Sequence, residues 1–162
     1  MKVIFLDVDG VLNSEYDLMI HREKNNIKGS ILYAEVEDRP LKLLKKLVEK
    51  TSAKIVVSSS WRIGCERSGR QSVFGADLYK KLEKRLSDYD LYIYDITPVC
   101  NGQRGDEIRE WLNAHKCVDR FVILDDDSDM CEYTETNLVQ TDYSNGLQEK
   151  HIQTAYKMLM AS

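Results

Sequence analysis

The sequence lacks long apolar runs and has few residues of the kinds that form zinc sites or disulfide frameworks. No apolar stretch in the 162 residues approaches the roughly 20 residues of a membrane span. The four cysteines (Cys65, Cys100, Cys117 and Cys131) contain no CxxC pair, and the three histidines (His21, His115 and His151) lack metal-ligand spacing. We therefore interpret the cysteines as free thiols, with a zinc site or a disulfide as the alternative, and expect no membrane association.

Long basic segments are also missing. The formal net charge is −4, which argues against nucleic-acid binding driven by bulk charge but leaves a local basic patch open. Asp7 interrupts the first apolar run, so the N-terminal region does not resemble a signal peptide, and we expect a cytoplasmic protein. The length and the 43% hydrophobic content suit one globular domain. The sequence does not specify an oligomeric state.

Apolar segments alternate with helical patterns along the chain. Buried strands are predicted at 3–6, 54–57, 91–94, 121–124 and, from a weaker signal, 138–140. Helices are predicted with Asp38 as N-cap, across Leu78 to Leu86, from Gly105 onward, and from about Gln148 to Met160. This alternation predicts an α/β fold of three layers with a mostly parallel sheet that is covered on both faces.

Two stretches fit this alternation poorly. We interpret residues 13–37 as a flap or small insertion and the polar residues 62–76 as a loop, within one domain that spans 1–162. About 30 residues separate Asp9 from the helix at Pro40, too few for a large additional domain. The sequence therefore predicts an open site with no large cap.

Acidic and hydroxyl side chains directly follow the predicted strands. Asp7 and Asp9 follow the first strand, Ser58 to Ser60 follow the second, Asp95 closes the third, and Asp125 to Asp129 follow the fourth. Ligands of parallel α/β sheets gather at the carboxyl ends of the strands, so we expect these groups to converge on one edge. Like charges placed this close together repel and require a nearby positive charge.

Magnesium is the cation that this group of side chains favours. Oxygen ligands without histidine or cysteine suit Mg²⁺, which Asp7 could hold with Asp125 or Asp126. A run of hydroxyls can accept the hydrogen bonds of a phosphate. Arg104, at a predicted helix start, is placed in sequence to supply a second positive charge to that phosphate.

Four segments together resemble the motifs of the haloacid dehalogenase (HAD) superfamily of phosphohydrolases. They are "FLDVDGV", "KIVVSSS", the basic residue Arg104 and "FVILDDDSD", in the order and spacing of that superfamily across residues 3 to 129. The resemblance implies a Rossmann-like HAD fold. The combination of "SSSWR", "RGDEIREWL" and "ILDDDSDM" is most similar to the HAD domain of Swiss Army Knife RNA repair proteins.

The resemblance also implies roles for individual residues. Asp7 is expected to be the nucleophile, and Asp9 the general acid and base, with its backbone carbonyl on Mg²⁺. Asp126 matches the usual metal-binding acid, and Asp125 matches a position that varies. Arg104 is expected to neutralise the phosphate. Ser58 is the first choice for the phosphate-binding hydroxyl, with Ser59 left open, and Gly10 is expected to let the backbone approach the phosphate.

The motifs and the resemblance together imply a Mg²⁺-dependent phosphatase that forms an aspartyl-phosphate. The expected partner is a phosphorylated substrate, either a nucleotide or a nucleic-acid end, with Arg62, Arg67 and Arg70 as candidate substrate contacts. The alternatives are a sugar-phosphate phosphatase, a HAD-like binding or regulatory protein with little activity, and a receiver domain of a response regulator. Trp61 and Trp111 are interpreted as packing residues. Asp95, Asp127 and Asp129 are left without a role.

Overall fold

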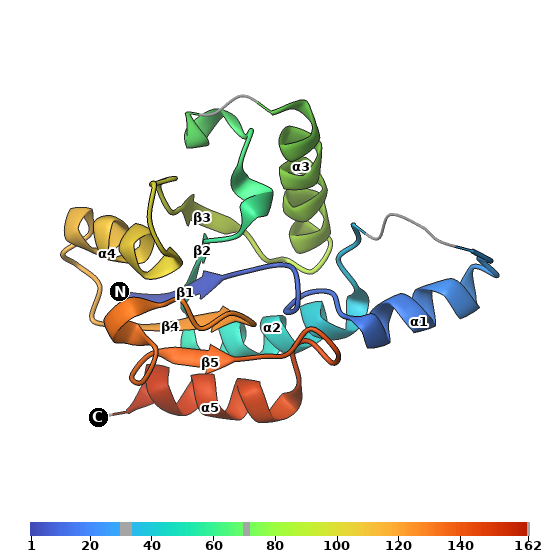
Figure 1. Cartoon of the computed structure of the whole chain (residues 1–162). Helices are drawn as coiled ribbons and strands as arrows, with labels where there is room; N and C mark the ends of the chain where they lie inside the picture. Colours follow the sequence, from blue (N-terminus) through green and yellow to red (C-terminus); the bar gives the residue numbers. More distant parts are fainter. Residues whose placement is uncertain (30–33, 70–71, 162) are drawn as a thin grey trace.

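A five-stranded parallel sheet organises the protein, in a computed structural model that describes residues 1–29, 34–69 and 72–161. Within these residues the strand order is β3-β2-β1-β4-β5 (Figure 1). The strands are β1 (Lys2–Leu6), β2 (Lys54–Val57), β3 (Ile93–Ile96), β4 (Arg120–Asp125) and β5 (Leu138–Gln140). Each neighbouring pair runs parallel, which confirms the predicted fold class.

Helices cover both faces of this sheet. The described helices are α1 (Glu15–Lys24), α2 (Asp38–Thr51), α3 (Val73–Ser87), α4 (Arg104–Ala114) and α5 (Glu149–Met160), with short 3₁₀ turns η1 (Ser60–Arg62), η2 (Glu66–Ser68) and η3 (Cys131–Tyr133). Figure 1 shows α2 and α5 side by side against one face of the sheet, and α4 lies on the other face. None of the described helices is long and apolar enough to cross a membrane.

The continuous apolar runs of the strands follow from burial on both faces. Successive strand residues point to opposite faces, so Ile4 and Leu6 enter the larger core, which contains the leucines of α2 and the apolar stripe of α5. Val3 and Phe5 point the other way and pack against Ile108 and Trp111 of α4. The rings of Phe5 and Trp111 meet edge to face, with centroids 5.4 Å apart.

The third strand and the start of α2 are the boundaries whose differences from the sequence prediction have a clear physical reason. The third strand begins at Ile93 and not at residue 91, because Leu91 is buried in the core and bonds back to Leu86 before the chain reaches its pairing register with β2. Asp95 consequently lies inside β3. The N-cap of α2 is Glu37, and the predicted cap, Asp38, is the first helical residue and is hydrogen-bonded by Arg85.

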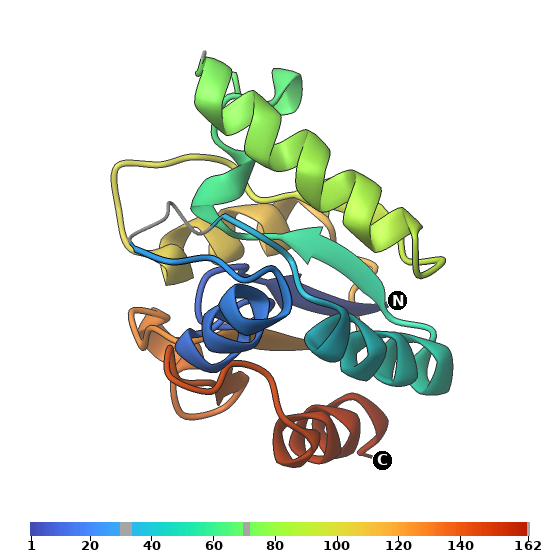
Figure 2. The same cartoon turned by 90° about the vertical axis from the view of Figure 1, so that its right-hand side faces the viewer.

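The segment predicted as a flap contains α1. Ser14 caps this helix by accepting the Asp17 N–H, and Arg39 of α2 donates to both oxygens of the buried Asp17 carboxylate. This fixes the base of α1, while the rest of the helix projects from the body of the molecule (Figures 1 and 2). The described residues contain no large cap. Residues 30–33 lie outside the description, so the outer part of this flap stays a prediction.

Candidate active site

The site lies at the carboxyl ends of β1, β2 and β4, where the connection from β1 leads to β2 on one side and the connection from β4 leads to β5 on the other. Such a reversal of strand order opens a crevice beyond the strand ends. The Asp7 N–H donates to the Leu124 carbonyl, and the Ser58 N–H donates to the Leu6 carbonyl. The sheet ladder therefore extends one residue past each strand, and it holds Asp7 between the serines on one side and the acids after β4 on the other.

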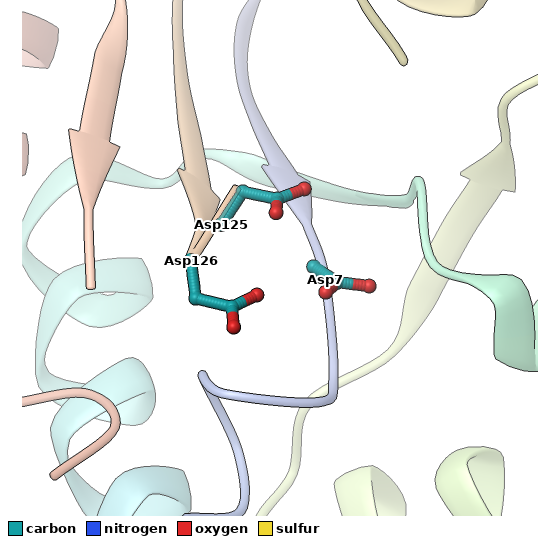
Figure 3. A group of neighbouring side chains, drawn as sticks. All are labelled: Asp7, Asp125 and Asp126. Carbon is teal, nitrogen blue, oxygen red and sulfur yellow. The ribbon is translucent and has the colours of Figure 1, made fainter. Parts of the chain in front are cut away.

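Three carboxylates converge at this point, as predicted. Asp7, Asp125 and Asp126 each place an oxygen within 4.8 Å of the other two (Figure 3). Burial raises the pKa of Asp7 to about 6, with Arg104 and the Ser59 hydroxyl opposing the rise. Burial and the Asp7 charge raise the pKa of Asp125 to about 8. Burial also raises the pKa of Asp126. The cluster therefore requires either protons or a cation.

A hard cation fits the donor set. Asp125 Oδ1 accepts the Asp127 N–H at 3.0 Å, but Asp125 Oδ2 is buried and has no hydrogen-bond partner among the described residues. All available donor atoms are oxygens, which suits Mg²⁺ better than softer metals. Both Asp125 and Asp126 have an oxygen within reach of such an ion, so the geometry does not favour one of them.

Gly10 allows the acidic clusters to meet. It has a φ of +69°, and a Cβ at this position would lie 2.4 Å from the Asp126 carboxyl group. Any side chain here would displace Asp126, which explains the glycine. The Gly10 N–H donates to Asn13 Oδ1 at 3.1 Å, so this N–H is already used inside the protein. The expectation that Gly10 lets the backbone approach a phosphate stays a prediction.

The structure distinguishes the three serines after β2. Ser58 and Ser59 are fully buried, whereas Ser60 is exposed at the start of η1. Ser58 Oγ has no hydrogen-bond partner among the described residues, while the Ser59 hydroxyl is used by Asp7 and by the Trp61 N–H. A buried hydroxyl without a partner is unfavourable unless a ligand supplies one, so Ser58 is the serine that is free to bind a phosphate oxygen.

Arg104 lies where the sequence predicted a positive charge. It is the first residue of α4, and its Nη1 lies 3.8 Å from Asp7 Oδ1 without a hydrogen-bond partner in the described chain. Asp129 fixes this end of the helix, because its carboxylate accepts the Arg104 N–H and its carbonyl accepts the Gly105 N–H. Asp129 thus has a role that the sequence did not indicate.

The Asp9 carboxylate is held by two side chains that the sequence did not assign to the site. Asn13 Nδ2 donates to Asp9 Oδ1 at 2.9 Å, and Trp61 Nε1 donates to Asp9 Oδ2 at 2.9 Å. The first contact is local, since Asn13 lies four residues after Asp9. The signal for the second was the tryptophan in "SSSWR", which was interpreted as packing alone.

Arg62 is not a substrate contact, and this prediction was wrong. Its side chain is 2% exposed and forms an ion pair with Glu107 at 2.6 Å. It also donates to the carbonyls of Ser59, Thr97 and Pro98, so it ties the loops after β2 and β3 to α4. Each of the three nitrogens of its guanidinium group donates to a group inside the protein.

Arg67 and Arg70 differ in what the structure says of them. Arg67 is exposed on η2, as a substrate contact requires, whereas Arg70 lies outside the described residues.

Asp95, left without a role by the sequence, accepts the Trp111 Nε1–H at 2.7 Å, and His115 stacks on the same indole. Asp127 is exposed and contributes its backbone N–H to Asp125.

The strand order and these side chains define a class of domain. A parallel sheet carries an Asp-x-Asp-Gly turn after β1, serines after β2, an arginine at the start of α4 and paired acids after β4, which is the arrangement of HAD-type domains. The family described as the HAD domain in Swiss Army Knife RNA repair proteins matches residues 3–152. The chain belongs to this family, which confirms the resemblance drawn from the motifs. A comparison with curated proteins finds no match.

Proposed function

We propose that the protein is a Mg²⁺-dependent phosphomonoester hydrolase that forms an aspartyl-phosphate on Asp7. The observation that carries this proposal is the set of buried atoms without partners that surrounds Asp7, namely Ser58 Oγ, Arg104 Nη1 and Asp125 Oδ2. A hydroxyl donor and a guanidinium donor suit a phosphate, and a carboxylate oxygen suits a cation. Membership of the HAD family supports a hydrolase of this type.

The chemistry needs two transfers of the phosphoryl group. A carboxylate oxygen of Asp7 attacks phosphorus, the bond from phosphorus to the leaving oxygen breaks, and that oxygen takes the proton of Asp9. Water then attacks the phosphorus of the aspartyl-phosphate and gives its proton to Asp9, which releases inorganic phosphate and restores the Asp7 carboxylate. Ser58 and Arg104 bind the phosphoryl oxygens during both transfers.

Asp7, Asp125, Asp126 and the Asp9 carbonyl would hold the Mg²⁺ ion. When bound, the ion would supply positive charge that offsets the repulsion between Asp7 and the incoming phosphate. Its binding has a readout that does not depend on turnover: Mg²⁺ should raise the melting temperature of the protein, and Asp125→Asn with Asp126→Asn should abolish that rise.

The substrate class that we propose is a nucleotide or a phosphorylated nucleic-acid end. No large cap covers the strand ends that carry Asp7 among the described residues, and the family description names RNA repair proteins. Exposed Arg67, which follows β2, could attract a nucleic-acid backbone. The net charge of −4 opposes such an attraction, so the charge near the site has to outweigh it.

A phosphate-release screen tests the proposal. The panel should contain p-nitrophenyl phosphate, nucleotides, sugar phosphates, and oligonucleotides with 3′- or 5′-phosphates, each with Mg²⁺ and with EDTA. We expect release that needs Mg²⁺ and is abolished by Asp7→Asn. Full activity in EDTA, or in the Asp7 variant, would disprove the assignment. Faster hydrolysis of sugar phosphates than of any nucleotide or oligonucleotide would change the substrate class and leave the phosphatase assignment intact.

A further inference from the structure

Trp61 and Asn13 hold the Asp9 side chain from two sides. The two hydrogen bonds reach different oxygens of one carboxylate, each at 2.9 Å, near the most favoured length for an N–H···O bond. Donors on both oxygens fix the rotation of the carboxyl group as well as its position. No ion pair to Asp9 is found among the described residues, so these two neutral donors determine its orientation.

Both donors are themselves fixed. Asn13 is 2% exposed, and its Oδ1 accepts the Gly10 N–H, which establishes that its amide nitrogen faces Asp9. The same nitrogen also donates to the Glu35 carbonyl at 3.2 Å, so Asn13 links Asp9 to the returning end of the 13–37 segment. The amide therefore has no remaining freedom to turn away from Asp9.

Trp61 reaches Asp9 from a distant part of the sequence. Its backbone N–H donates to Ser59 Oγ, and the next residue is the buried Arg62, anchored by Glu107 and three carbonyls. The Trp61 side chain is 2% exposed. A substrate base cannot stack on a ring that is covered in this way, so the indole acts through its N–H and not through its face.

We infer that Trp61 and Asn13 are positioning residues that aim the Asp9 carboxyl group at the leaving oxygen, an inference that rests on the proposed phosphatase function. The proposed reaction requires Asp9 to give a proton to one oxygen and later to accept one from water. A side chain with free torsions spends most of its time in orientations that serve neither transfer. The two hydrogen bonds remove that freedom before substrate binds.

The chain contains a matched control for the indole N–H. Trp111 is also nearly buried, at 3% exposure, and it also donates Nε1 to an aspartate Oδ2, that of Asp95, at 2.7 Å. This second contact joins α4 to β3, and neither Trp111 nor Asp95 has a hydrogen bond to Asp7 or Asp9 among the described residues. Trp61→Phe and Trp111→Phe therefore remove the same type of bond in two different places.

The experiment measures kcat/KM over aryl and alkyl phosphates whose leaving groups become steadily more basic. Wild-type turnover of p-nitrophenyl phosphate comes first, and its absence would count against the proposed function. With an active wild type, Trp61→Phe should lower kcat/KM for an alkyl phosphate by about 10- to 100-fold, the range for the loss of one hydrogen bond to a charged group. It should lose little on p-nitrophenyl phosphate, whose leaving group needs no proton. Trp111→Phe should change kcat/KM by the same factor for every substrate in the series.

A double variant tests whether Trp61 acts through Asp9. With the alkyl phosphate, adding Trp61→Phe to Asp9→Asn should cost nothing further, because the group that Trp61 positions is already gone. If the double variant shows the product of the two single-variant losses in kcat/KM, the inference is overturned. A loss in Trp61→Phe that is equal across the leaving-group series would also overturn it. If Trp61→Phe fails to fold, benzothienylalanine at position 61 keeps the shape of the indole and lacks only the N–H. The same leaving-group dependence is expected of it, and unchanged kinetics would overturn the inference.

Discussion

Two buried charged regions of this molecule are built on opposite principles. In one, Arg62 and Glu107 form an ion pair, and the remaining donors of Arg62 reach backbone carbonyls. In the other, Asp7, Asp125 and Asp126 bring three like charges together, with Arg104 3.8 Å from Asp7 and buried atoms left without partners. The first region is complete in the protein alone. The second lacks matching counter-charges among the described residues, as expected of the cation and phosphate site proposed above.

The largest effect is expected when one acid of the unpaired cluster of Asp7, Asp125 and Asp126 is neutralised. Asp7→Asn should lower the rate of phosphate release by a factor on the order of 10⁴ or more, because the nucleophile is lost. The same change should raise the melting temperature of the metal-free protein, because it removes a buried repulsive charge. Activity and thermal denaturation, both measured with and without Mg²⁺, check these two effects. A variant that is both inactive and less stable without metal would contradict the view that repulsion between the buried carboxylates destabilises the metal-free protein.

Neutralising the acid of the Arg62–Glu107 ion pair should instead lower the stability of the protein. Glu107→Gln leaves Arg62 buried without its counter-charge and should cost about 3–5 kcal/mol of folding free energy. Chemical denaturation would measure this loss. Glu149→Gln, at an exposed ion pair with Lys46, is a suitable control and should change stability by less than about 1 kcal/mol. Equal losses in the two variants would mean that the Arg62–Glu107 pair is not the structural element described above.

The pH dependence of stability should come from the incomplete region. The folded-state pKa values of Asp7 and Asp125 are raised to about 6 and about 8, so the folded protein holds protons that the unfolded chain releases near pH 4. Stability therefore falls as pH rises through these values. Between pH 6.5 and 8.5, mainly as Asp125 loses its proton, we expect the metal-free protein to lose about 1–2 kcal/mol of folding free energy.

Thermal denaturation across this range, in EDTA and in Mg²⁺, would measure the effect. Mg²⁺ should flatten the curve, because a bound cation replaces the protons. Asp125→Asn should flatten it in EDTA as well. A metal-free protein whose stability rises from pH 6.5 to 8.5 would show that these carboxylates are not held protonated.

The same comparison explains how far the sequence could predict the structure. Asp7, Asp125 and Asp126 could be placed together because each follows an apolar strand, and parallel strands end at a common edge. Arg62 could not be placed, because an arginine in a polar loop is usually exposed. Its burial depends on Glu107, which lies 45 residues later.

The orientation of Asp9 was equally hidden from the sequence. The Asn13 contact is local, but the Trp61 contact spans 52 residues, and its donor is a side chain that hydrophobicity alone explains. The predicted start of β3 was wrong because Leu91 is as apolar as a strand residue but is buried before the pairing with β2 begins. Sequence patterns thus located the groups that we propose to bind ligands, while the groups that hold them in place depended on long-range contacts.

The smallest expected effect concerns a positive charge that belongs to neither buried region. Arg67 is exposed on η2, after the carboxyl end of β2, and Lys54 is exposed at the amino end of the same strand. If the substrate is a phosphorylated oligonucleotide, Arg67→Ala should raise its KM about two- to threefold and lower the slope of log(1/KM) against log[salt] by about 0.7, the value for one contact to a single strand. Lys54→Ala should leave both unchanged, because its charge lies at the opposite end of the sheet. Turnover of p-nitrophenyl phosphate should be the same in both variants, since that substrate has no backbone to attract. An unaltered salt slope in Arg67→Ala would remove this residue from substrate binding, and the charges that complete the site would then be those of Arg104 and the metal alone.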